Sequence, residues 1–273
     1  MFSAHETLLG ALLPALLEAG RVEMKYFEGP LTVERKSDQS PVTAADREAE
    51  AILLAALRSA APQIPVVAEE ASAAGNTPET NGTFFLVDPL DGTREFIDKR
   101  PEFTINVGLI ENRRPVFGVV YAPASGRLFA TPTRDGAVEA VLPVTAKDAD
   151  LAALRWNAIR VRALDPGAVV AVESFSHRSP ETGDILSRLK AKDIRRAGSS
   201  LKFCLIARGE VDIYPRIGPT CEWDTAAAHA VLNAAGGSVR TLDGQELAYG
   251  KAPKYLNPHF IAWGSREAPL VLA

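Results

Sequence analysis

Apolar residues recur at helical spacing in two stretches near the start of the chain. A stripe of leucines runs through residues 8–17, and a stripe of Ala, Ile and Leu runs through residues 49–57. Residues three and four apart lie on one face of an α-helix, so both stretches are predicted to form amphipathic helices. The second helix is expected to begin after Thr43, which suits an N-cap and has Asp46 three residues on.

Strand signals follow these helices. Phe84–Val87 is a short apolar run that stops at Asp88-Pro89, and residues 104–110 alternate. Residues 116–121 come after a polar turn, so these last two stretches predict an antiparallel hairpin. Farther along, strands are predicted at residues 169–172, 211–214, 238–241 and 260–263, and helices at residues 199–207 and 224–235.

The pattern weakens between residues 132 and 166, where Pro, Asp and Gly are scattered. We place a domain boundary in this stretch. Residues 1–150 then form an N-terminal α+β domain with most of the candidate metal ligands, and residues 151–273 form a C-terminal α/β domain. Strands and helices mix without a strict βαβ alternation, which favours an α/β protein of the α+β type, layered around mixed sheets.

Composition and charge exclude several classes of protein. The 273 residues include 34 acidic and 30 basic side chains, a net charge of −4, and 47% are hydrophobic. The apolar fraction is too high for a disordered chain. A near-neutral balance without a long Lys/Arg run gives no electrostatic footprint for nucleic acid or for an anionic membrane, and a local basic pocket is left open.

Cysteine and leucine usage bear on the cellular compartment. Cys204 and Cys221 are too few for a disulfide framework, and they fit a reducing compartment. The leucine-rich stretch at residues 8–17 is too short to cross a bilayer and lacks the flanks of a signal peptide. We therefore expect a cytoplasmic protein without a transmembrane segment. Peripheral association with the inner membrane and the oligomeric state are left open.

The run from Val87 to Thr93, VDPLDGT, carries the strongest chemical signal. A predicted strand meets a proline that breaks the ladder and a glycine that permits a tight turn. Asp88, the Leu90 carbonyl and Asp91 can then converge, and hard oxygen ligands of this kind suit Mg²⁺. The alternative is a plain turn whose Asp side chains cap a helix or bond their own backbone. From this run alone the two interpretations have equal weight.

Two further acidic features lie at predicted element ends. Glu69-Glu70 follows an apolar run, and Asp224 precedes an Ala-rich helix. Each has a simpler interpretation, which is a solvated edge for the glutamates and an N-cap for Asp224. Active sites of layered α/β proteins are commonly built at such ends, so the three features together favour one acidic site.

In this order and at these separations, the three acidic motifs resemble the inositol monophosphatase superfamily of lithium-sensitive, magnesium-dependent phosphatases. Four more stretches narrow the resemblance to its bacterial 3′(2′),5′-bisphosphate nucleotidase branch: residues 40–46, 118–123, 198–203 and 214–216. The resemblance spans most of the chain. It implies the layered αβαβα sandwich of that superfamily, with mixed sheets.

The resemblance also implies a site for two Mg²⁺ ions that share one carboxylate, with a third ion left open. The implied ligands are Glu69, Asp88 and the Leu90 carbonyl for one ion, and Asp88, Asp91 and Asp224 for the other. Asp46 and Thr93 would polarise the attacking water. A helix cap is the alternative role for Asp46, and both roles can hold through different atoms.

The implied substrate contacts extend into the second half of the chain. Ser199 and Lys202 would contact a phosphate, and Arg216 would add a second cationic contact. His177 would lie near the nucleoside, although a surface or core role is the simpler interpretation of that histidine. The full implied set is Glu69, Leu90, Asp91, Gly92, Thr93, His177, Ser199, Lys202, Arg216 and Asp224.

The function implied is hydrolysis of the 3′-phosphate of 3′-phosphoadenosine 5′-phosphate by in-line attack of water, which gives AMP and phosphate. This would clear a by-product of sulfate assimilation. The alternatives are inositol monophosphate or the 2′-phosphate of NADP as the substrate of the same mechanism, and a non-catalytic metal or nucleotide sensor.

Other phosphate chemistries lack their motifs. The chain has no G-x-x-x-x-G-K-[ST] loop and no G-x-G-x-x-G turn. A covalent cysteine phosphatase would need Arg six residues after its nucleophile, but Glu210 follows Cys204 and Ala227 follows Cys221 at that distance. The four histidines are dispersed, so a zinc site is not expected.

Overall fold

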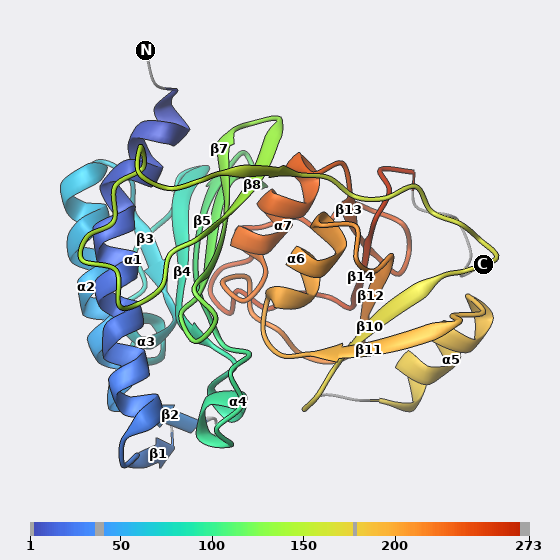
Figure 1. Ribbon diagram of the computed structural model, residues 1–273, viewed down its shortest axis with the longest axis horizontal. Helices are drawn as coiled ribbons and strands as arrows, with labels where there is room; N and C mark the ends of the chain where they lie inside the picture. Colours follow the sequence, from blue (N-terminus) through green and yellow to red (C-terminus); the bar gives the residue numbers. More distant parts are fainter. Residues whose placement is uncertain (1–2, 36–40, 177–178, 268–273) are drawn as a thin grey trace.

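Five alternating layers of helix and sheet make up the computed structural model, which describes residues 3–35, 41–176 and 179–267. In Figure 1 two long helices cover one face of a seven-stranded sheet, and two shorter helices lie between this sheet and a five-stranded one. Another helix packs on the far face of the second sheet. The order is αβαβα with mixed sheets, so the predicted fold class is confirmed.

The outer helices bear out the first hydrophobic pattern. They are α1 (Ala4–Glu28) and α2 (Ala44–Ala60). Their leucine stripes are buried against the sheet. Each helix begins with a capping box, formed by Ser3 with Glu6 and by Thr43 with Asp46. The predicted N-cap at Thr43 is therefore confirmed.

The first sheet has the order β3-β4-β5-β6-β7-β8-β9, in which β3 and β4 are parallel and the later neighbours are antiparallel. Its strands are β3 (Val66–Ala68), β4 (Thr83–Asp91), β5 (Thr104–Glu111), β6 (Arg114–Ala122), β7 (Arg127–Thr133), β8 (Gly136–Val141) and β9 (Asn157–Ile159). The predicted hairpin is confirmed as β5 and β6. The division of the chain at residue 150 stays a prediction.

The second sheet has the order β11-β10-β12-β14-β13. Its strands are β10 (Val170–Ser174), β11 (Asp193–Ala197), β12 (Ile213–Arg216), β13 (Ser238–Thr241) and β14 (Phe260–Trp263). The sequence pattern missed β11, because four of the five residues of this edge strand are exposed and leave no apolar alternation. It also missed the helix on the far face, α5 (Pro180–Arg188).

The remaining elements are short, and most of them lie beside the pocket that is described below. They are β1 (Val33–Arg35), β2 (Pro41–Thr43), α3 (Glu69–Ala73), α4 (Thr93–Ile97), α6 (Leu201–Ala207) and α7 (Ala226–Ala234). β1 and β2 form a small antiparallel ribbon.

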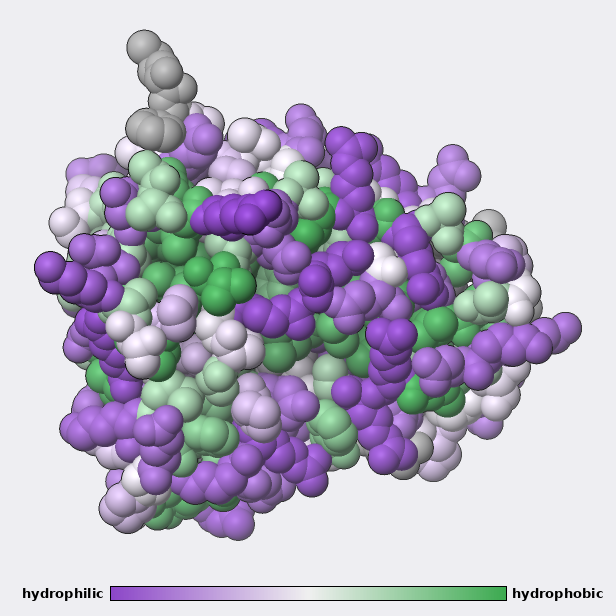
Figure 2. All heavy atoms as spheres, viewed as in Figure 1, coloured by the Kyte–Doolittle hydropathy of each residue, from purple (hydrophilic) through white to green (hydrophobic). Residues whose placement is uncertain are grey.

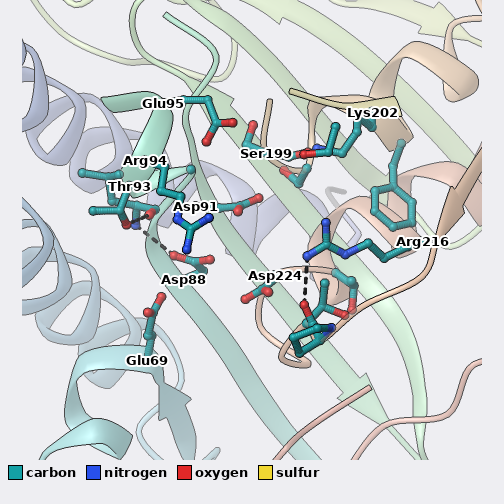
Figure 3. A pocket seen from close by; sticks show the side chains of 18 of the residues that line it. Glu69, Asp88, Asp91, Thr93, Arg94, Glu95, Ser199, Lys202, Arg216 and Asp224 are labelled. Atoms are coloured by element: carbon teal, nitrogen blue, oxygen red, sulfur yellow. Dashed lines mark hydrogen bonds between the residues drawn. The ribbon is translucent and has the colours of Figure 1, made fainter. Parts of the chain in front are cut away.

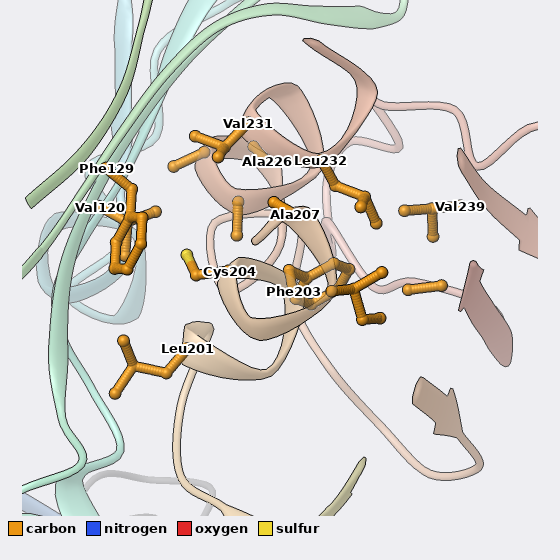
Figure 4. Packing of buried hydrophobic residues seen from close by; sticks show 14 of the residues in the cluster. Val120, Phe129, Leu201, Phe203, Cys204, Ala207, Ala226, Val231, Leu232 and Val239 are labelled. Carbon is orange, nitrogen blue, oxygen red and sulfur yellow. The ribbon is translucent and has the colours of Figure 1, made fainter. Parts of the chain in front are cut away.

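The middle layer rests on two glycines of the first sheet. Gly108 on β5 is paired with Gly118 on β6. A Cβ at Gly118 would lie 2.1 Å from the carbonyl oxygen of Ala227, and one at Gly108 would lie 2.9 Å from the Cβ of Ala226. Only glycine permits this close approach of the backbone of α7. Figure 4 shows the apolar side chains of α6 and α7 filling the space between the two sheets.

Polar and charged side chains cover most of the face seen in Figure 2, with smaller apolar patches between them. Among the described residues, no helix combines the length and the apolar character that a bilayer crossing requires.

Glu23 on α1 is an exception among the buried side chains. It is fully buried, and within the described part of the chain neither of its carboxylate oxygens has a hydrogen-bond partner. Asp46 on α2 and Tyr121 on β6 are its ionisable neighbours. Burial, and after it the charge of Asp46, raises the pKa of Glu23 well above its ordinary range. The folded protein therefore keeps Glu23 protonated at pH values where an unfolded chain ionises it.

Stability is expected to fall as pH rises because of this group. Above pH ~4.3, the ordinary pKa of glutamate, the unfolded chain releases the proton that the folded protein holds. From pH 5 upward, and until the raised pKa is passed, wild type is expected to lose up to about 1.4 kcal/mol of unfolding free energy per pH unit relative to Glu23→Gln. Urea unfolding of both proteins between pH 5 and 8 measures this. Glu28→Gln, on the exposed end of the same helix, is the control. A difference that does not change with pH would contradict the assignment.

Candidate active site

A pocket of about 220 Å³ opens where the end of β4 meets the beginnings of α4, α6 and α7. Figure 3 shows carboxylates gathered on one side and in the centre of this pocket, with the Arg94 guanidinium among them in this view and Lys202 and Arg216 across from them. The labelled carboxylates of this group are Glu69, Asp88, Asp91 and Asp224, and the cations are Lys202 and Arg216. The pocket thus joins motifs from both halves of the chain.

The end of β4 places the two central carboxylates. β4 pairs regularly with β5 as far as Asp88, and the register shifts between Asp88 and Asp91. Pro89, which has no N–H to donate, lies in this irregularity. Gly92 then takes a left-handed conformation with φ of 93°. The Leu90 N–H donates to Oδ1 of Asp88 at 3.0 Å. The backbone-bonding turn is therefore real, and both Asp side chains line the pocket as well.

The other two carboxylates come from helix ends. Glu69 is the first residue of α3, and its side chain shares a hydrogen bond with Asp88. Asp224 precedes α7, and its Oδ2 accepts the backbone N–H of Cys221 at 3.0 Å. The N-cap of α7 is Thr225, whose side chain makes no capping bond. The alternative interpretation of Asp224 as an N-cap is therefore wrong.

Burial and mutual repulsion act together on these carboxyl groups. Burial, followed by the charges of its three acidic neighbours, raises the pKa of Asp88 well above its usual range. Burial, and then the charges of Asp91 and Glu69, raise the pKa of Asp224 in the same direction. Burial raises the pKa of Asp91 to about 6, although Lys202 acts against this. A cation among these groups would relieve the repulsion.

The donor set fits a hard divalent cation, because every candidate ligand is an oxygen atom. Within the described ranges, no three His, Cys, Asp or Glu side chains are already close enough together to enclose an ion. Mg²⁺ uses few protein carboxylates and keeps several waters or phosphate oxygens as ligands. An open group of carboxylates beside a pocket suits it better than a closed cage does.

Asp46 and Thr93 meet at the edge of the pocket. Oγ1 of Thr93 lies 3.4 Å from Oδ1 of Asp46 and 3.2 Å from the carbonyl oxygen of Leu90. The other oxygen of Asp46, Oδ2, accepts the N–H of Thr43 at 2.8 Å. The helix cap and the contact with Thr93 therefore use different oxygens of one carboxylate.

Lys202 and Arg216 form the cationic side of the pocket. Nζ of Lys202 donates to the carbonyl oxygen of Ser199 at 2.5 Å and lies 5.2 Å from the centre of the Tyr214 ring. Burial lowers the pKa of Lys202 to about 8. Nη2 of Arg216 donates to the carbonyl oxygen of Pro219 at 2.8 Å. Its buried Nε has no hydrogen-bond partner among the residues described.

The pocket has two charged residues that the sequence reasoning missed. Glu95 is buried on α4 and accepts the hydroxyl of Ser176 at 2.6 Å, and Arg94 lines the pocket beside it. Both directly follow the motif that ends at Thr93, so the continuing charged run was the available signal. His177 lies outside the described residues. The other implied substrate contacts all line the pocket: Glu69, Leu90, Asp91, Gly92, Thr93, Ser199, Lys202, Arg216 and Asp224.

Known proteins similar to this chain belong to one family of phosphatases. The model of the inositol monophosphatase family matches residues 5–269. The chain belongs to the inositol monophosphatase family. It is 41% identical over 249 residues to the 3′(2′),5′-bisphosphate nucleotidase CysQ of Salmonella typhimurium, a match that covers 89% of this chain and 94% of that protein. The CysQ of Escherichia coli K12 is 39% identical over 244 residues, with the same two coverages.

Solved structures of the inositol monophosphatase family agree with the fold. CysQ from Bacteroides thetaiotaomicron superposes with a TM-score of 0.77 at 35% identity, covering 94% of this chain and 97% of that one. An inositol monophosphatase from Thermotoga maritima gives a TM-score of 0.69 at 26% identity, covering 92% and 90%.

Replacement of Asp88 by Asn is expected to separate metal binding from folding. The variant removes a repelled buried charge but can still accept the Leu90 N–H, so in EDTA it is expected to unfold at the wild-type temperature or above. Wild type is expected to gain stability with Mg²⁺, about 2.7 kcal/mol at a hundred times the dissociation constant, and Asp88→Asn to gain far less. Thermal unfolding with and without MgCl₂ measures both effects. Asp98→Asn, an exposed site just after α4, is the control. An equal Mg²⁺ response in Asp88→Asn would contradict the metal site.

Proposed function

We propose that the protein is a 3′(2′),5′-bisphosphate nucleotidase that removes the 3′-phosphate from 3′-phosphoadenosine 5′-phosphate and gives AMP and phosphate. The observation that carries this proposal is one pocket in which Lys202 and Arg216 lie across from Glu69, Asp88, Asp91 and Asp224. The two relatives at about 40% identity described above carry the name of this activity. The proposed setting is the cytoplasm, where the reaction would serve sulfur metabolism.

The two sides of the pocket suit a substrate with two phosphates. Four carboxylates repel a phosphate unless cations lie between them, so the scissile phosphate needs metal ions there. A second phosphate lies beyond those ions and needs its own cationic contact. Lys202 offers such a contact, and so does Nε of Arg216, which has no hydrogen-bond partner in the described part of the chain. A substrate with a single phosphate would leave these groups unused.

The proposed metal is Mg²⁺, with two ions during turnover and a third left open. One ion would be held by Glu69, Asp88 and the Leu90 carbonyl, and the other by Asp88, Asp91 and Asp224. When bound, Mg²⁺ supplies Lewis-acid stabilisation of the charge on the phosphoryl group and on the attacking and leaving oxygens.

Asp46 and Thr93 are the proposed water-activating pair. An attacking water must lose a proton as its oxygen bonds to phosphorus and the bond from phosphorus to O3′ of the ribose breaks. The Thr93 hydroxyl can relay that proton to Oδ1 of Asp46, because the two oxygens lie 3.4 Å apart. The bonds that Oδ2 receives from Thr43 hold the carboxylate in place. The ribose oxygen then leaves with a proton from solvent.

Substrate preference is expected to follow the second phosphate. The kcat/KM for 3′-phosphoadenosine 5′-phosphate is expected to exceed those for inositol 1-phosphate and for the 2′-phosphate of NADP. Arg216→Gln is expected to lower it about 10- to 100-fold, the effect of one charged hydrogen bond, and to change kcat/KM for 3′-AMP much less. Phosphate release measured on all four substrates provides the comparison. Higher kcat/KM on inositol phosphate would overturn the nucleotidase proposal.

Asp46→Asn is expected to separate catalysis from binding. The variant retains an acceptor for Thr43 but loses the proton acceptor, so kcat is expected to fall about 10²- to 10⁴-fold with substrate affinity nearly unchanged. Steady-state kinetics together with calorimetric binding of the substrate test this. Glu48→Gln, on the exposed face of the same helix, is the matched control. Unchanged turnover in Asp46→Asn would contradict the role assigned to Asp46, whereas absent turnover in wild type would support the non-catalytic sensor.

A further inference from the structure

Glu50 on α2 holds the first turn of α3, the helix that begins with Glu69. Oε2 of Glu50 accepts the backbone N–H of Glu70 at 2.7 Å, and Oε1 accepts the N–H of Ala71 at 2.8 Å. The preceding residue, Ala68, is the N-cap of α3 and makes no side-chain capping bond. A carboxylate from another helix therefore satisfies the N–H groups that a local cap would bind.

Burying the carboxylate of Glu50 beside an acidic site costs free energy. Glu50 is 5% exposed, and a buried carboxylate is costly unless hydrogen bonds stabilise its charge. Two backbone N–H groups provide that stabilisation. Both belong to the residues directly after Glu69, so the same bonds restrain the backbone that carries the Glu69 side chain toward Asp88.

The position of Glu50 on α2 connects two parts of the site. Asp46 and Glu50 are four residues apart and share one face of this helix. Asp46 reaches Thr93 at the pocket, while Glu50 reaches the backbone of α3. A single rigid turn of α2 thus spans from the water-activating pair to the chain segment of a metal ligand.

We propose that Glu50 is a positioning residue, which holds Glu69 in place for Mg²⁺ by binding the backbone of α3. Because Glu50 and Asp46 lie on the same helix, this contact also fixes the position of Glu69 relative to Asp46. Glu50 itself does not line the pocket. The inference rests on the proposed metal site, but its main readout is metal binding without substrate, so it can fail or hold independently of the nucleotidase proposal.

The test is Mg²⁺ affinity measured by titration calorimetry on the full chain. In Glu50→Gln one of the two backbone bonds is lost, since an amide NH₂ cannot accept an N–H. The affinity is expected to fall about 10- to 100-fold, the usual effect of losing the partner that orients a metal ligand. Glu48→Gln, which removes an exposed carboxylate from the same helix, is expected to bind Mg²⁺ as wild type does. Wild-type affinity in folded Glu50→Gln would overturn the proposal.

Two further measurements distinguish positioning from general stabilisation. In a Glu69→Gln background, adding Glu50→Gln is expected to weaken Mg²⁺ binding little further, because the two residues act through one ligand. Fully additive losses would overturn the proposal. With substrate present, kcat of Glu50→Gln is expected to return toward wild type at saturating Mg²⁺.

If Glu50→Gln does not fold, two other experiments test the proposal. Glu50→Asp keeps the charge but withdraws the carboxylate by one methylene, and it is expected to lose Mg²⁺ affinity as Glu50→Gln does. In wild type without metal, the amides of Glu70 and Ala71 are expected to exchange slowly with solvent although α3 is one short helix. Rapid exchange at both amides would contradict the hydrogen bonds between Glu50 and the backbone of α3.

Discussion

The repulsion among four carboxylates in one pocket is the constraint on which the rest of this structure depends. Asp88 and Asp224 have raised pKa values because burial and their acidic neighbours disfavour ionisation. The surrounding fold must hold such a group in place, and bound cations would relieve the repulsion. The metal requirement that we propose is therefore a consequence of charge packing and not an addition to the fold.

The layered architecture holds these carboxylates in place. Asp88 and Asp91 come from the irregular end of a central strand, and α7 brings Asp224 to them from the middle layer. That helix can approach because Gly108 and Gly118 leave its backbone room on the sheet. On the outer side, α2 contributes Asp46, and it contributes Glu50, which accepts two hydrogen bonds from the backbone of α3. The outer helix α2, the first sheet and the middle helix layer thus each contribute acidic side chains to the site.

Much of this could be predicted from the sequence, and the misses have physical causes. The leucine stripes of α1 and α2 and the hairpin of β5 and β6 bury one face each, so their periodicity is strong. Strand β11 exposes four of its five residues, and helix α5 is short and buries only Thr182, Ile185 and Leu186 among its nine residues, so neither carries a long apolar pattern. Glu50 was missed for another reason, because its partners are backbone N–H groups, which no side-chain motif reveals.

The sequence by itself determined which chemical groups are present and where each lies relative to its own element. A proline and a glycine after a buried strand place oxygens at a turn, and the three acidic motifs identify the family. Only the tertiary structure decided that Asp224 faces Asp88 and is no helix cap, and that Lys202 and Arg216 lie across the same pocket. It also decided that Glu23 is buried with no hydrogen-bond partner among the described residues. These facts depend on contacts between segments far apart in the chain, and local periodicity carries no information about such contacts.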